Sequence, residues 1–180
     1  RQFKVSQRFY RLHARLLGER QITLADRSVK IGAITQKFDF STSVSILREI
    51  LGRVNSRYVD LLDQFLANGQ IDVYPKMGKK SGAYCGGSGQ LSTFILLNHT
   101  DDIRSFETLA HEFGHAIHTE LSKNQPPLYR GYSTVTAEVA STFFEQLALD
   151  ELANHLPPAE KIILQHHRLL GDISTVFRQI

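Results

Sequence analysis

The stretch that most constrains this chain of 180 residues is His111-Glu112-Phe113-Gly114-His115, in which two histidines lie four positions apart. Residues at this spacing lie on one face of an α-helix, one turn apart. Pro126-Pro127 closes the segment. Apolar residues around the two histidines recur at helical spacing and predict a buried stripe: Phe106, Leu109, Ala110, Phe113, Ala116, Ile117 and Leu121. We therefore predict a helix that carries both imidazoles on one side.

Two imidazoles at this spacing suit one Zn²⁺ ion, which histidine nitrogens bind at about 2.0–2.1 Å. Glu112 is too near in sequence to be a third ligand on the same helix. Its carboxylate can instead reach a water activated by the metal and accept a proton from it. The alternative is an ordinary half-buried helix whose two histidines are hydrogen-bonded, because so short a pattern also occurs by chance.

A catalytic zinc site needs a third protein ligand and an open fourth position. The pattern His-Glu-x-x-His-x-x-Gly-x-x-His is excluded, because the chain has His118 and Leu121 at the last two of these positions. The other route takes a glutamate from a second helix, and Glu138 lies in a segment that begins with capping residue types at Ser133.

The segment around Glu138 has apolar residues at helical spacing: Val135, Val139, Phe143 and Leu147. Glu138 could be a solvated helix charge, which is the usual role of a glutamate. We expect these apolar, alanine-rich surroundings to be buried, and an unpaired carboxylate there would be costly. This favours Glu138 as the third ligand.

His111 through His118, followed by Ala137 through Glu145, resembles the M3 family of zinc peptidases, specifically its oligoendopeptidase F branch. Upstream segments at 71–74, 78–84 and 94–98 extend the resemblance, so that it runs from about residue 71 to 146. It implies a zincin-like metallopeptidase core, mainly α with a small β-sheet next to the zinc helix. A second helix supplies the glutamate.

The resemblance also implies an activity, namely zinc-dependent endopeptidase hydrolysis of short peptides with one Zn²⁺ per chain. The metal would be held by His111, His115 and Glu138, and Glu112 would be the catalytic base. Family members carry tyrosine and histidine residues downstream that stabilise the oxyanion. No matching segment is present, and neither Tyr129 nor Tyr132 can be assigned that role.

Other residues are candidates for supporting roles. Glu145, two turns after Glu138, and Glu107, one turn before His111, could accept the second N–H of a metal-bound histidine. Either could instead be a solvent-exposed charge. His118 lies about 10 Å along the helix from His111 and cannot share the same ion. The candidates for substrate contact are His118, Asn98, His99, Gly82 and Tyr84.

Two short strands are predicted, at Ile71–Tyr74 and Thr93–Asn98. If the second lies at a sheet edge, its free backbone groups could pair with an extended peptide. The glycine-rich segment Gly78–Gly89 is either a flexible connection or a loop whose backbone approaches the peptide.

We expect residues 1–180 to form a single catalytic-core region. Its parts are a helical segment (1–70), strands with the glycine-rich loop (71–100), zinc-site helices (101–152) and a C-terminal helix (153–180). Helices are predicted at 2–17, 41–54 and 55–68, and a last one from Pro157-Pro158 that Gly171 breaks or kinks. Family members are longer, so the resemblance implies a core fragment or a small relative.

Composition limits the partners. The net charge is only +3 without a basic run, which argues against nucleic acid, and no apolar span of membrane length is present. Arg8, Arg11 and Arg15 suggest a solvated helix face. The single cysteine, Cys85, excludes an internal disulfide, fits a cytoplasmic location and is expected to be a passive thiol.

We expect oligopeptides as substrates, in a channel that flanking regions of the same chain complete. Two alternatives stay open. One is a zinc-binding peptidase core or interaction module that is catalytically incomplete. The other is a metal-free helical interaction domain in which His111, His115 and Glu138 are incidental.

Overall fold

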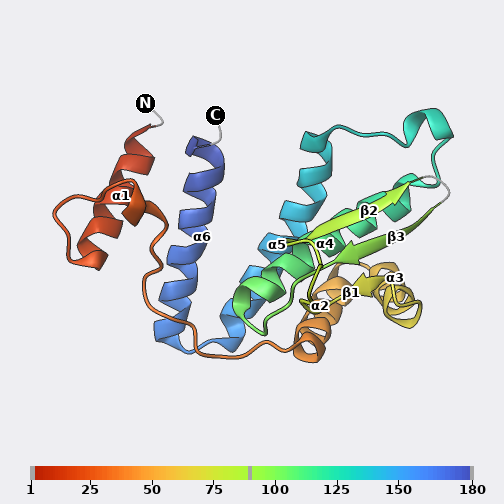
Figure 1. Ribbon diagram of the computed structural model, residues 1–180, viewed down its shortest axis with the longest axis horizontal. Helices are drawn as coiled ribbons and strands as arrows, with labels where there is room; N and C mark the ends of the chain where they lie inside the picture. Colours follow the sequence, from red (N-terminus) through yellow and green to blue (C-terminus); the bar gives the residue numbers. More distant parts are fainter. Residues whose placement is uncertain (1–2, 89–90, 179–180) are drawn as a thin grey trace. The chain divides into compact units, whose positions relative to one another are not determined.

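The computed structural model describes residues 3–88 and 91–178, and these residues are mainly α-helical with a small three-stranded sheet (Figure 1). They divide into two compact units, which we call the central unit (36–155) and the terminal unit (1–35 with 156–180). The elements in chain order are α1 Phe3–Leu17, η1 Ala25–Ser28, α2 Phe40–Val54, α3 Ser56–Ala67, β1 Ile71–Asp72, β2 Tyr84–Ser88, β3 Leu91–Leu96, α4 Ile103–Ser122, η2 Pro127–Tyr129, α5 Thr134–His155 and α6 Pro158–Arg178.

Helices α2 and α3 of the central unit begin and end where capping residues predict. The Asp39 carboxylate accepts the backbone N–H of Thr42 at the start of α2. Asn55 ends α2 and caps α3, and Gly69 follows α3 with a φ of +65°. The predicted helices at 41–54 and 55–68 are therefore confirmed to within a residue at each end.

The sheet has the order β1-β3-β2, with β1 parallel and β2 antiparallel to β3. The expectation that the strand at 93–98 could be an edge strand is wrong, because β3 is paired on both sides. Its Ile95 and Leu97 donate to backbone oxygens around β1, while the second half of the glycine-rich segment forms β2. In the described part of the sheet β2 is an outer strand. Gly89, which was counted in that segment, lies outside the described residues.

Helix α4 carries the His-Glu-x-x-His pattern through the core of the central unit. Asp102 caps it by accepting the N–H of Ser105. The predicted stripe is buried except for Leu121, which is partly exposed. Phe113 meets Phe65 of α3 edge to face at 5.7 Å. Each such buried aromatic contributes about 1.5–3 kcal/mol, so packing holds the helix in place.

Helix α5 turns a different face to the core than its apolar pattern predicts. Val135, Val139 and Phe143 are 77%, 67% and 51% exposed. Phe144, Ala148, Leu149 and Leu152 are buried instead, together with Ser141. The expectation that Glu138 lies on a buried helix is therefore wrong, because its side chain is 48% exposed.

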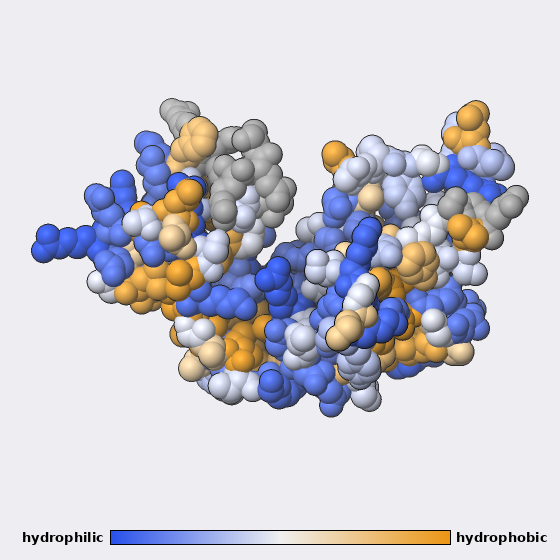
Figure 2. Space-filling model, viewed as in Figure 1, coloured by the Kyte–Doolittle hydropathy of each residue, from blue (hydrophilic) through white to orange (hydrophobic). Residues whose placement is uncertain are grey.

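Apolar side chains reach the surface of both units (Figure 2).

In the terminal unit α1 packs against α6, and Phe9, His13 and His166 stack at the contact. Helix α6 begins at Pro158, as predicted, and continues through Gly171 to Arg178, so the predicted break is wrong. One glycine costs about 1 kcal/mol in a helix interior, which packing of the remaining turns offsets. Among the described residues, no helix is long and apolar enough to span a bilayer.

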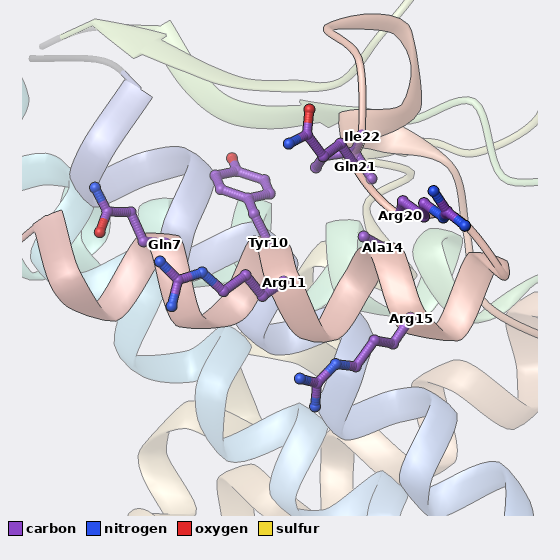
Figure 3. A pocket seen from close by; sticks show the side chains of 8 residues that line it. All are labelled: Gln7, Tyr10, Arg11, Ala14, Arg15, Arg20, Gln21 and Ile22. Atoms are coloured by element: carbon purple, nitrogen blue, oxygen red, sulfur yellow. The ribbon is translucent and has the colours of Figure 1, made fainter.

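A pocket of about 550 Å³ lies beside α1 in the terminal unit, and Figure 3 shows its lining residues Gln7, Tyr10, Arg11, Ala14, Arg15, Arg20, Gln21 and Ile22. The guanidinium groups of Arg11, Arg15 and Arg20 point in different directions, and Arg15 projects from the side of α1 opposite Tyr10 (Figure 3). Arg8, Arg11 and Arg15 are exposed, which agrees with a solvated helix face.

Candidate metal centre

The candidate centre lies where α4 and α5 approach each other most closely. A Cβ placed on Gly114 would lie 2.7 Å from the Cα of Ser141 and 2.9 Å from the carbonyl oxygen of Ala140. Real Cβ atoms do not come so close to backbone. The glycine therefore permits the contact, and it lies directly before His115 and opposite the turn that follows Glu138.

The predicted ligands come together at this crossing. The Nε2 atoms of His111 and His115 lie 3.4 Å and 3.7 Å from Oε2 of Glu138. One ligand atom from each of the three residues lies within 4.8 Å of the other two. Two imidazole nitrogens and one carboxylate oxygen, all partly open to solvent, are a donor set that suits zinc and leaves room for a further ligand.

Glu145 orients one of these histidines. Its Oε2 lies 2.6 Å from Nδ1 of His111. An ionised carboxylate only accepts hydrogen bonds, so Nδ1–H donates to Glu145, and Nε2 is the ring nitrogen that faces Glu138. Glu145, and not Glu107, makes this hydrogen bond; Glu107 is half-buried one turn before His111.

His111 and His115 are in opposite electrostatic situations. Burial by itself would lower the pKa of His111, but the hydrogen bond and charge of Glu145, with the charges of Glu112 and Glu138, raise it overall. Burial and the neighbouring charge of His111 lower the pKa of His115. A lowered pKa keeps His115 neutral, as a metal ligand must be.

Glu112 is 7% exposed and lies close enough to His111 and Glu138 to interact with their charges. Burial raises the pKa of its carboxyl, although the charge of His111 and a hydrogen bond from the backbone N–H of Cys85 oppose the shift. Its Oε2 has no hydrogen-bond partner among the described residues. A buried carboxylate with one oxygen tethered and the other unpartnered is suited to accept a proton.

The surroundings of Cys85 disfavour the thiolate form that a nucleophile needs. Burial, with the nearby charges of Glu112 and Glu120, raises its pKa to about 12. At neutral pH the thiol is therefore protonated, which agrees with the expectation of a passive side chain.

The candidates for substrate contact are placed differently from one another. Asn98 donates to the carbonyl oxygens of Lys80 and Gly82, at 2.9 Å and 2.7 Å, and so organises the glycine-rich segment. His99 is 3% exposed and its Nε2 bonds the carbonyl oxygen of Phe38 at 2.9 Å, so it supports the fold and does not face a surface. Tyr84 is exposed on β2.

His118 is stacked on Tyr132, with ring centroids 4.1 Å apart and planes at 16°. The Tyr132 hydroxyl lies 2.8 Å from Oγ1 of Thr119, which fastens the connection between α4 and α5 to the end of α4. Tyr132 was not assigned from the sequence, because nothing local indicates which tyrosine of this connection returns to the helix.

Sequence reasoning also missed the hydroxyl of Ser141, which donates to Oε2 of Glu138 at 2.9 Å. The spacing is a usable signal, because residues three apart on a helix can touch. The backbone N–H of Cys85 gave no such signal, since its approach to Glu112 depends on how β2 lies against α4.

A second carboxylate–histidine cluster, Glu49, Glu151 and His155, also has ligand atoms within 4.8 Å of one another. Here the guanidinium of Arg53 hydrogen-bonds both Glu49 and the buried Glu151. A protein cation thus already occupies the position that a metal would need.

Comparisons with known proteins agree with this geometry. Residues 45–177 match the model of peptidase family M3. The chain is 38% identical over 131 residues to oligopeptidase PepF of Bacillus subtilis, which covers 72% of this chain and 20% of the relative. It is 30% identical over 174 residues to group B oligopeptidase PepB of Streptococcus agalactiae, covering 96% of this chain and 29% of the relative.

Solved structures share the fold. A proposed peptidase of Chlamydophila abortus superposes with a TM-score of 0.83 at 28% identity, covering 98% of this chain and 30% of the other. A structure from Bacillus anthracis has a TM-score of 0.79 at 19% identity, over 93% of this chain and 31% of the other. The chain thus spans less than a third of the length of these relatives. The family match covers more than half of the chain, and from it and the crossing of α4 and α5 we conclude that this chain belongs to peptidase family M3, with an oligoendopeptidase F-like sequence.

Proposed function

We propose that this chain is the core of a zinc-dependent endopeptidase that hydrolyses short peptides. One observation carries the proposal: ligand atoms of His111, His115 and Glu138 lie within 4.8 Å of one another, and the buried carboxylate of Glu112 follows His111 directly. A structural metal site has no use for an unpartnered carboxylate oxygen at that place, whereas hydrolysis does.

In this proposal His111, His115 and Glu138 hold one zinc ion. Bound zinc would supply Lewis-acid chemistry, which acidifies a water molecule and polarises the scissile carbonyl. Glu145 accepts the Nδ1–H of His111, so that Nε2 is the nitrogen left to bind metal, and metal binding would displace any proton from it.

Glu112 is the general base and then the general acid. It accepts a proton from the attacking water at its unpartnered oxygen and gives the proton to the leaving amine. Its raised pKa makes the carboxylate a stronger base toward water, and the protonated carboxyl is still acidic enough to protonate a leaving amine. The N–H of Cys85 holds the carboxylate in place throughout.

The outer edge of β2 is where we propose that an extended peptide pairs. Ile95 directs its N–H toward β1, and therefore its cross-strand partner Cys85 directs its backbone groups away from β3. One of those groups, the Cys85 N–H, reaches Glu112. The same edge would supply main-chain hydrogen bonds to a substrate, which tolerate many sequences.

The exposed apolar stripe of α5, formed by Val135, Val139 and Phe143, starts beside Glu138. We propose that flanking regions of the same protein cover it and complete the substrate channel, since the chain spans less than a third of its relatives. The same fact favours the second candidate function, a zinc-binding core that is catalytically incomplete.

The test measures bound zinc per chain together with cleavage of a quenched fluorescent peptide. We expect near-stoichiometric zinc in the wild-type chain, a large loss of zinc in Glu138→Gln, and retained zinc without cleavage in Glu112→Gln. Glu49→Gln is the matched control, because it alters a carboxylate of the other metal-like cluster. It should leave zinc content unchanged.

Zinc with cleavage would support the enzyme, and zinc without cleavage in the wild-type chain would support the incomplete core. Absence of zinc after reconstitution of the folded chain would refute both. Loss of zinc in Glu49→Gln rather than Glu138→Gln would move the metal to the other cluster.

A further inference from the structure

Ser141 contacts the carboxylate of Glu138, which is the zinc ligand that α5 supplies in the proposed site. Its Oγ lies 2.9 Å from Oε2 of Glu138 and 3.1 Å from the backbone carbonyl oxygen of the same residue. We propose that Ser141 is a positioning residue, which holds the Glu138 carboxylate toward His111 and His115. The inference rests on the proposed function, because it concerns how that site is held ready for metal.

Glu138 needs such a constraint because its own surroundings provide little. Its side chain is 48% exposed and lies near the start of α5. An exposed glutamate samples many rotamers, and most of them direct the carboxylate into solvent. His111 and His115 are more enclosed, and Glu145 orients His111. Of the three proposed ligands, Glu138 therefore has the most side-chain conformational freedom to give up when it binds metal.

Ser141 can supply the constraint because it is itself immobilised. Its side chain is fully buried, and its Cα is the atom closest to the position that a Cβ on Gly114 would take. The backbone of α5 is thus fixed against α4 at this residue. The hydroxyl donates a hydrogen bond from this fixed position to Oε2 of Glu138. The same oxygen faces the Nε2 atoms of His111 and His115.

The hydroxyl has two acceptors within reach, and charge decides between them. A serine three residues after a helical carbonyl often bonds that carbonyl. The ionised carboxylate is the stronger acceptor, because hydrogen bonds to charged groups are shorter and roughly twice as strong. The carbonyl loses nothing, since it remains in the hydrogen-bond ladder of α5. The bond also leaves the carboxylate a second oxygen and further lone pairs for metal.

The test compares metal affinity in Ser141→Ala and Thr142→Ala, measured by chelator competition with Zn²⁺ and by the visible absorption of bound Co²⁺. Thr142 is an exposed neighbour on α5, so its variant removes a hydroxyl from the same helix and leaves the buried Ser141 in place. We expect Ser141→Ala to weaken zinc binding about 10–100-fold, the usual effect of removing a hydrogen bond to a ligand. We also expect its Co²⁺ spectrum to change, and Thr142→Ala to resemble wild type.

A double-mutant cycle separates positioning from a general loss of structure. In a Glu138→Ala background, Ser141→Ala should have no further effect on metal affinity, because the residue through which it acts is gone. If Ser141→Ala lowered metal affinity by the same factor in the Glu138→Ala background, the positioning proposal would be overturned. Unaltered metal affinity in the single variant Ser141→Ala would also overturn it, but the zinc-site proposal would stand. A wild-type chain that binds neither Zn²⁺ nor Co²⁺ would overturn both.

Discussion

The two units each contain a close pair of histidines, and the pairs differ in almost every other respect. His111 and His115 of the central unit have ring centroids 4.9 Å apart with planes at 81°. His13 and His166 of the terminal unit have centroids 5.1 Å apart, but their planes are nearly parallel at 11°. The first pair lies on one helix and the second joins α1 to α6.

The partners of the two pairs explain the difference. Carboxylates of Glu138 and Glu145 approach His111. His13 instead bonds the backbone oxygen of Asp26 through Nε2 and faces Nε2 of His166 through Nδ1, at 3.1 Å. Burial and the neighbouring histidines lower the pKa of His166, which favours its neutral form.

A short distance between imidazoles therefore says little about metal binding. What distinguishes the central pair is that its two Nε2 atoms converge with a carboxylate oxygen and are partly open to solvent. In the terminal pair, Nδ1 of His13 lies next to Nε2 of His166, and Nε2 of His13 lies next to a backbone oxygen. Phe9 stacks on both rings. Substitutions in each unit test this difference between the two histidine pairs.

The largest effect is expected for Gly114→Ala. The added Cβ meets backbone atoms of α5, which cannot move aside as a side chain would, so we expect destabilisation of about 3 kcal/mol. Zinc affinity should fall with it, because Glu138 is displaced from the histidines. Denaturant unfolding and chelator competition measure the two effects, and wild-type stability would show that the helices do not cross so closely.

Glu145→Ala should weaken zinc binding about 10–100-fold, because His111 then loses the acceptor that fixes its tautomer. Glu107→Ala is the matched control, since this carboxylate was the other candidate for the same role. Chelator competition on both variants decides between them. Equal losses, or a larger one in Glu107→Ala, would contradict the assignment to Glu145.

Acid should destabilise the fold through His166. Its folded pKa is lowered, so its stabilising contribution is present above the unfolded value of about 6.5 and is lost as pH falls through the folded pKa. Each unit of pKa difference corresponds to about 1.4 kcal/mol. Denaturant unfolding at about pH 7.5 and about pH 5 should show a smaller loss for His166→Gln than for wild type. Identical losses would show that His166 is not the group responsible.

The smallest effect on the free energy of unfolding is expected for Gly171→Ala in α6. Its sign is opposite to that of Gly114→Ala. A Cβ at this position meets no atom within 4 Å. Alanine favours the helix by about 0.5–1 kcal/mol relative to glycine, so the variant should be more stable. Thermal unfolding measures the shift. A destabilised variant would indicate that α6 does bend at Gly171, as its sequence predicts.

Local patterns predicted much of the fold. Asn55, Gly69 and Pro158 mark helix ends through backbone conformation and capping, which involve only near neighbours, and the structure confirms them. The pattern failed for α5, whose apolar residues are exposed. There the choice of buried face depends on a close helix crossing, which small residues such as Ser141 permit and large ones do not.

The sheet shows the same limit. The sequence predicted two strands near Ile71 and Ile95, but it did not predict that they pair with each other in parallel. Strand order is decided by hydrogen bonds between distant segments, and the third strand comes from a glycine-rich stretch that has no strand pattern. As a result, the edge assigned to β3 belongs in the described sheet to β2.

Residue spacing was enough to predict the contents of the candidate site: two histidines one helical turn apart, a carboxylate beside them and a glutamate on a following helix. Helical periodicity is a local property, so spacing alone suffices to predict such a set. Packing between the helices then places Glu138 near both Nε2 atoms and Glu145 beside Nδ1 of His111, and it buries Ser141, whose hydroxyl donates to Glu138. Those contacts depend on the distance and angle between α4 and α5, which packing at Gly114 sets and no single segment encodes.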